Sequence, residues 1–246
     1  MRHRLKQTSA ALAVSAFAFS SAVHGQLWTA GHGDLGIEYM GNNELELEWH
    51  LGEDNEAVVI DGTSQTFGAE GQGFEAGDLT AQTNLSGTRQ AGTQWDFIGV
   101  ASGETFYVFP QTEDPTVPFL GIGTEELAAS DWSTDLTYTL TSLTGPGAFS
   151  LYTVDSFGAP AELISTDGGI SGSVSQAAGT HEHYNWAFSK TGTYDLTFEV
   201  SGTHITDGLA TGSETFSFSV VPEPASAGLF LAVTGLFAVF APRRRV

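Results

Sequence analysis

The chain has 246 residues, contains no cysteine and carries 29 acidic residues against 8 basic ones. Its hydrophobic fraction of 41% is enough for a globular core, and the absence of cysteine excludes disulfides and thiolate metal sites. The net charge of −21 excludes nucleic acid as a partner, because phosphate groups are repelled by such a surface.

The first residues have the order of an export signal. A basic start is followed by an apolar run over 10–19 and by Val23-His24-Gly25, which offers small residues where a signal peptidase reads. We therefore expect a signal peptide at 1–25 that signal peptidase removes before Gln26. An uncleaved membrane anchor is the alternative, although the apolar run is short for a membrane span.

Residues 26–221 show almost no helical periodicity, and short alternating runs predict an all-β domain. Apolar residues alternate with glutamates over 44–49, and Gly41-Asn42-Asn43 just before them predicts a hairpin turn. The segment 62–92 is rich in Gly, Ser, Thr and Gln and has weak patterning. It predicts long loops with one short helix at 75–79.

From residue 95 onward the pattern sharpens. Strands are predicted at 97–100, 105–109, 136–141, 149–153, 163–164 and 215–220, with loops at 110–118 and 121–126. Roughly ten or eleven short strands with turns at regular spacing predict an antiparallel β-sandwich, Ig-like or jelly-roll-like.

The most strongly patterned stretch is 181–200. Aromatic residues alternate with His181, His183 and Asn185, and a second alternating run covers 194–200 after a glycine. We expect these two runs to form one hairpin. Its aromatic face should point to the core and its His-x-His pair should lie on the polar face.

The last 25 residues, 222–246, contain Pro222-Glu223-Pro224, an apolar stretch over 225–241 and a final Arg243-Arg244-Arg245. This order resembles the PEP-CTERM sorting signal of Gram-negative bacteria, whose proteins are held by the tail and processed near the Pro-Glu-Pro by an exosortase. The apolar stretch predicts a transmembrane helix in the inner membrane, with the arginines on the cytoplasmic side. A permanent C-terminal anchor is the alternative, and with either the domain should face outward.

Without its two ends the domain is far more acidic than the whole chain. Arg89 and Lys190 are then its only basic residues against 28 acidic ones, a net charge of −26. Such a surface repels anionic polymers and suits a saline or cation-rich medium, or the binding of divalent cations.

Short motifs run through the domain: GHGD at 31–34, YVFPQ at 107–111, FLG at 119–121, TEE at 124–126, GPG at 145–147, HEHYNWAF at 181–188, GTY at 192–194 and SGT at 201–203. Together they resemble the choice-of-anchor M domain of surface-anchored proteins, known mainly from actinobacterial cell walls. The resemblance spans nearly the whole domain and is weakest over 62–92. It implies a surface location and carries no established enzymatic activity. Some members of that family are encoded beside metal-type ABC transporters.

The domain has five histidines, all in or beside patterned segments. The candidate metal ligands are His32, Asp34, His50, His181, His183 and His204. His181 and His183 share a strand face, so their rings can converge on one ion at about 2.0–2.1 Å. We expect these two rings within about 4 Å of each other, a third ligand from the others, and zinc or another divalent metal as the cofactor.

The same histidines also fit a hydrogen-bonded framework without metal, or a contact with a polar ligand. No catalytic motif is present: His181-Glu182-His183 lacks the spacing of a zinc protease, and no Gly-x-Ser-x-Gly elbow fits a strand-to-helix turn. We therefore predict no enzymatic activity.

The sequence thus predicts an exported cell-surface or extracellular-matrix protein that binds a divalent metal. A purely structural or adhesive envelope protein is the alternative. A carbohydrate-binding module is a third, with Trp95, Trp132 and Trp186 as a stacking platform. Besides signal peptidase and exosortase, the expected partners are extracellular polysaccharide or other envelope components.

Overall fold

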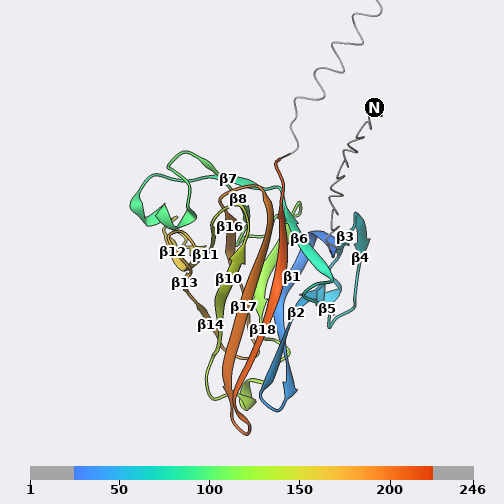
Figure 1. Ribbon diagram of the computed structural model, residues 1–246. Helices are drawn as coiled ribbons and strands as arrows, with labels where there is room; N and C mark the ends of the chain where they lie inside the picture. Colours follow the sequence, from blue (N-terminus) through green and yellow to red (C-terminus); the bar gives the residue numbers. More distant parts are fainter. Residues whose placement is uncertain (1–24, 224–246) are drawn as a thin grey trace, which may run out of the picture.

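The computed structural model describes residues 25–223 and shows an all-β sandwich (Figure 1). Strands take 57% of the described residues and 3-10 helices 6%, so the fold class predicted from the alternating runs is confirmed. The signal peptide at 1–25 and the sorting segment at 222–246 lie outside the described residues, apart from 25, 222 and 223. No helix in the described part of the chain has the length and apolar character needed to cross a bilayer.

Two sheets of unequal size make up the sandwich. Twelve strands form the larger sheet: β1 (Gln26–Gly41), β2 (Glu44–Leu51), β3 (Val58–Ile60), β4 (Thr63–Gln65), β5 (Gln72–Glu75), β6 (Leu79–Thr83), β9 (Pro118–Gly123), β10 (Leu136–Thr144), β14 (Val174–Gln176), β15 (His181–His183), β17 (Gly192–His204) and β18 (Gly208–Val220). Six strands form the smaller sheet: β7 (Ser86–Thr88), β8 (Thr105–Phe109), β11 (Phe149–Val154), β12 (Pro160–Ser165), β13 (Ser171–Gly172) and β16 (Asn185–Phe188). Three short 3-10 helices accompany them: η1 (Glu53–Asn55), η2 (Thr93–Ile98) and η3 (Ala129–Asp131).

The main core lies between the two sheets and is rich in aromatic rings. Trp186 of β16 is fully buried; it meets Phe198 of β17 edge-on at 5.9 Å and stacks on Phe218 of β18 at 5.8 Å. Each buried ring of this size contributes about 3 kcal/mol or more to folding. The core therefore holds the sheets together without disulfides.

A second, smaller core covers the outer face of the smaller sheet. Trp95 and Phe97 of η2 pack there against Tyr152 of β11. The strand predicted at 97–100 is therefore wrong, because residues 97 and 98 end the 3-10 helix η2 and residues 99 and 100 lie outside any strand. Gly99, in a left-handed conformation with φ 75°, ends the helix and interrupts any extended run.

The hairpin predicted over 181–200 is also wrong, although the burial pattern behind it is confirmed. β15 pairs with β9 in the larger sheet, β16 lies between β8 and β11 in the smaller sheet, and β17 lies between β10 and β18. The chain therefore crosses between the sheets twice within this stretch. Alternation determines which face of a strand is buried, and it carries no information about the sheet that the strand joins.

The loop-rich segment 62–92 contains four short strands, β4 to β7. The helix predicted at 75–79 is wrong: β5 ends at Glu75, and β6 begins at Leu79 and pairs with β1 and β18. The loop predicted at 121–126 is wrong in its first half, because β9 continues to Gly123.

The hairpin turn predicted at 41–43 is confirmed. Residues 33–41 of β1 pair antiparallel with β2, and Asn42 and Asn43 both have positive φ, at 55° and 67°. This is the backbone that a tight hairpin requires at its two central residues. The long β1 strand is thereby fixed against β2, with its other edge available for β9.

Candidate metal site

Three neighbouring strands bring most of the candidate ligands together. β9 lies between β1, which runs parallel to it, and β15, which runs antiparallel. The register places Gly121 of β9 beside both Asp34 of β1 and His183 of β15. A Cβ atom at Gly121 would collide with Oδ1 of Asp34 and lie 3.1 Å from Nδ1 of His183. The glycine therefore leaves space for these two side chains to face each other.

His32, His181 and His183 form what we call the histidine triad. The ring centroid of His32 lies 5.7 Å from that of His181 and 5.1 Å from that of His183, and the latter two are 5.5 Å apart. One nitrogen of each ring lies within 4.8 Å of the other two. Two nitrogens bound to one tetrahedral ion at about 2.1 Å are roughly 3.4 Å apart. Side-chain rotations that move the ring nitrogens by about 1 Å therefore bring the three rings onto one ion.

The ring centroids of His181 and His183 are 5.5 Å apart and one nitrogen of each lies within 4.8 Å of the other, so the expected closest approach of about 4 Å stays a prediction. The expected third histidine at similar range is present as His32. Phe119 of β9 stacks flat on the ring of His183 at 3.6 Å, with an angle of 9° between the planes. This contact holds one ring of the triad in a defined orientation.

Three of the seven buried side-chain polar atoms that lack a partner among the described residues lie at the triad and Asp34. Nε2 of His32, Nδ1 of His183 and Oδ1 of Asp34 are all buried and have no hydrogen-bond partner among the described residues. Asp34 is only 3% exposed. Buried polar atoms in native proteins are nearly always satisfied, and an ion is one of the few explanations when they are not. These atoms are also the donor types that a divalent transition metal prefers.

His181 differs from the other two rings because one of its nitrogens has a partner. Nδ1 of His181 lies 2.5 Å from Oε1 of Glu125, and 39% of its side chain is exposed. This contact leaves Nε2 of His181 free to bind an ion. A carboxylate that orients a metal-binding imidazole through its other nitrogen is a common feature of zinc sites.

Burial sets the protonation of the triad. Desolvation lowers the pKa of His32 and lowers that of His183 to about 4, so both rings are neutral at pH 7 and able to bind a metal. Burial also lowers the pKa of His181, but the hydrogen bond with Glu125 and the charge of Asp34 together raise it above its ordinary value. Burial raises the pKa of Asp34 to about 7.

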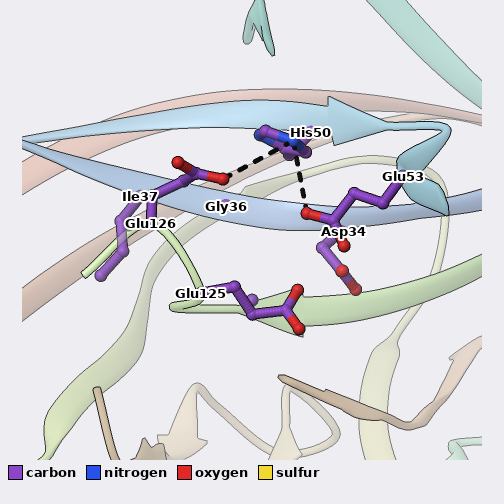
Figure 2. Close-up of a pocket in the computed structure, with 8 residues that line it drawn as sticks. Asp34, Gly36, Ile37, His50, Glu53, Glu125 and Glu126 are labelled. Carbon is purple, nitrogen blue, oxygen red and sulfur yellow. Dashed lines mark ion pairs between the residues drawn. The ribbon is translucent and has the colours of Figure 1, made fainter. Parts of the chain in front are cut away.

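His50 lies in a neighbouring acidic cluster, shown in Figure 2. Its Nδ1 is 3.2 Å from Glu48, and its Nε2 is 2.8 Å from the backbone carbonyl of Glu70, 3.4 Å from Glu53 and 3.8 Å from Glu126. The hydrogen bond with Glu48 is the largest cause that raises the pKa of His50 to about 9. Both ring nitrogens thus face acceptors, an arrangement that suits a protonated ring.

Between this cluster and the triad is a cavity of about 10 Å³, room for a single water molecule. Figure 2 shows Asp34, Glu53 and Glu125 reaching this region from three different segments. Oxygen atoms of Asp34 and Glu53 also lie within 4.8 Å of a nitrogen of His32. Asp34 therefore connects the acidic cluster to the triad.

His204 is not brought to the triad. Its ring stacks on Tyr39 at 4.6 Å, meets Trp132 edge-on at 5.5 Å and lies 3.3 Å from Asp207. Tyr39 is seven residues along β1 from His32, about 23 Å at the rise of an extended strand. Of the six candidate ligands, the structure thus groups four, places His50 beside them and leaves His204 elsewhere.

Above the triad is a hollow of about 300 Å³. It is lined by His32, Glu53, Asp54, Glu56, Glu113, Phe119, Glu125, His181 and His183. The five carboxylates and Phe119 were not among the predicted site residues. In so acidic a chain no single glutamate stands out, and the sequence marks Phe119 and Glu125 only as parts of the FLG and TEE motifs.

The three tryptophans considered as a sugar-binding platform do not share an exposed face. Trp186 is fully buried in the main core, and Trp95 is 7% exposed in the second core. Trp132 is partly exposed and lies against Tyr39 and His204.

No protein-family model, no curated protein and no solved structure matches this chain. Its function is therefore argued from the geometry of the triad and its surroundings.

Proposed function

We propose that this protein is an exported, non-enzymatic surface or matrix protein that binds one divalent transition metal ion through His32, His181 and His183. A single observation carries the proposal. Two rings of the triad present buried nitrogens without partners, and the third has one nitrogen oriented by a carboxylate and the other free. A framework of histidines without metal would have its buried nitrogens bonded to acceptors, as His50 has.

The donor set fits a metal of the zinc type. Imidazole nitrogens suit zinc, copper, nickel and iron, while calcium and magnesium prefer oxygen ligands. Glu125 acts on the ion through His181, as its contact with Nδ1 indicates. Asp34 lies 3.7 Å from Nε2 of His32 and balances the positive charge that a bound ion brings into a buried place.

The proposed location rests on the two ends of the sequence and on charge. The basic and apolar start, the Pro-Glu-Pro tail and the net charge of −26 between them all favour a domain outside the inner membrane. The resemblance to surface-anchored choice-of-anchor M proteins favours the same location. A domain of this charge also attracts divalent cations from solution.

Zinc-dependent stability tests the proposal. A ligand that binds only the folded state at 100 times its Kd raises the free energy of unfolding by about 2.7 kcal/mol, so Zn²⁺ should raise Tm clearly at pH 7.5. At pH 5 the effect should be much smaller, because a protonated His181 cannot bind metal.

The His181→Ala/His183→Ala double variant should fold and lose the zinc effect, since the core lies on the opposite side of the strands. His204→Ala removes a histidine away from the triad and is the matched control. A weak, many-site heat in calorimetry that is the same in all three proteins would show nonspecific binding to carboxylates. That result would favour a purely structural or adhesive role.

A further inference from the structure

The hollow above the triad gives a bound ion a side that faces solvent. The side chain of His181 is 39% exposed, whereas that of His32 is only 13% exposed. The buried nitrogens of His32 and His183 therefore hold the ion from the protein side, and the hollow of about 300 Å³ lies on the other. Three protein ligands with an open fourth position are typical of zinc sites that accept an external ligand.

The walls of this hollow are strongly acidic. Glu53, Asp54, Glu56, Glu113 and Glu125 all line it, and no lysine or arginine within residues 25–223 does. Burial and the charge of Glu125 raise the pKa of Glu53 to about 7. Even with Glu53 protonated, four carboxylates face the two positive charges of a divalent ion. The loaded hollow therefore keeps a negative potential, which repels anions that approach the metal.

Phe119 supplies the apolar part of the wall. One face of its ring is stacked on His183, and the side chain also lines the hollow. A flat, neutral nitrogen heterocycle can therefore reach the metal along an apolar surface and meets no charge repulsion. Imidazole nitrogen is also a good ligand for every metal that suits the triad.

We infer that the fourth coordination position of the triad-bound metal takes a neutral nitrogen donor, of the imidazole class, from outside the protein and excludes anionic ligands. The inference rests on the proposed metal binding and adds the identity of the external ligand. Such a donor is what a histidine side chain of another protein presents. The acidic hollow thus acts as a selectivity filter for the metal's open side.

Cobalt(II) makes the open position visible, because its absorption spectrum changes with its ligands. The full chain is loaded with Co²⁺ and titrated with imidazole and, separately, with azide. Imidazole should change the visible spectrum and saturate, and azide should bind at least about tenfold more weakly. At about 1 M salt, where the Debye length is about 3 Å, the difference between the two ligands should shrink.

Two double variants separate the effect of the carboxylates that line the hollow from the effect of the overall charge. Asp54→Asn/Glu113→Gln removes two charges from the hollow and should strengthen azide binding severalfold, with imidazole binding unchanged. Asp54 has a positive φ of 53°, a conformation that asparagine tolerates. Glu46→Gln/Glu214→Gln removes two charges from a different part of the surface and should leave both ligands unaffected.

The possible results separate the inference about the fourth ligand from the proposed metal binding on which it rests. A chain that takes up no cobalt overturns the proposed function, and the inference with it. A cobalt-loaded chain that binds azide as well as imidazole overturns the inference alone. So does a cobalt spectrum that neither ligand changes, because the fourth position is then closed from within the protein.

Discussion

The histidine triad and the His50 cluster contain the same residue types and differ in what surrounds each nitrogen. At His50 a glutamate accepts from one nitrogen and a backbone carbonyl from the other, and the pKa is raised to about 9. In the triad, His32 and His183 each have a buried nitrogen without a partner, and their pKa values are lowered. The first environment stabilises a protonated ring, and the second leaves neutral rings with unpartnered nitrogens.

A large number of carboxylates around a histidine therefore does not by itself create a site for a metal. Around His50, Glu48 and the backbone carbonyl of Glu70 satisfy the two ring nitrogens, and the carboxylates of Glu48, Glu53 and Glu126 stabilise the protonated ring. At His32 the nearest carboxylate, Asp34, is 3.7 Å away, beyond hydrogen-bond range, and at His181 Glu125 contacts only Nδ1. The predictions below test whether the two environments are as distinct in solution.

The largest expected effect separates the two clusters by metal affinity. His32→Ala removes a direct ligand and should weaken zinc binding by at least about 100-fold, beyond the 10–100-fold cost of losing an outer partner. His50→Ala should leave the affinity within a few-fold. Isothermal titration calorimetry at pH 7.5 measures both. Equal losses in the two variants would erase the distinction between the clusters.

The next effect concerns the free energy of unfolding, and here a His50 variant is the one that should show a change. The pKa of His50 is raised from 6.5 to about 9 in the folded protein, so its contribution is fully present below pH 6.5 and is lost as pH rises through 9. His50→Gln should therefore lower the free energy of unfolding by about 2 kcal/mol at pH 6 and by little at pH 10.

Urea unfolding across this pH range measures the difference. The charged groups that face His50 are Glu48, Glu53 and Glu126, and none of them is removed in the variant. A loss of stability that is the same at pH 6 and pH 10 would mean that His50 acts through packing and not through its charge.

A smaller effect is expected at Asp34, where stability and binding should move in opposite directions. Burial raises the pKa of Asp34 from 3.8 to about 7, so the metal-free protein loses stability as pH rises through 7. Asp34→Asn keeps the shape without the charge and should stabilise the metal-free protein at pH 8 by about 1–2 kcal/mol.

The same variant should bind zinc about tenfold more weakly, because a buried counter-charge to the ion is gone. Thermal unfolding with and without zinc gives both quantities from one preparation. A variant that is less stable than the natural protein in both states would assign Asp34 a structural role.

His183 and His32 show how much of the site the sequence predicts. The alternation around His183 correctly predicts that the aromatic neighbours are buried and that this histidine faces the other side. It cannot predict that β15 pairs with β9, because no strand was predicted at 118–123 and a loop was expected from residue 121 onward. The parallel pairing of β9 with β1, which brings His32 to the triad, joins segments about 87 residues apart.

The misassigned elements share one physical cause. The strand at 97–100 and the hairpin at 181–200 are predictions from local alternation. Such alternation indicates which side chains are buried, but it does not indicate which strand pairs with which. The 3-10 helix at 93–98 buries its apolar residues on the outer face of the smaller sheet, a surface that exists only once the sandwich has formed. His50 shows the same limit, because the backbone carbonyl of Glu70 that accepts from its Nε2 and the nearby Glu126 come from loops distant in sequence.

The smallest effect makes the sharpest comparison, because it uses two adjacent glutamates. Glu125 contacts His181 of the triad, and Glu126 faces His50. Glu125→Gln should weaken zinc binding about tenfold through the loss of the carboxylate that orients His181, and change the stability of the metal-free protein by no more than about 1 kcal/mol. Glu126→Gln removes one negative charge from the adjacent residue and should leave zinc affinity unchanged. If both variants weaken zinc equally, general electrostatic attraction explains the effect, and the oriented His181–Glu125 pair does not.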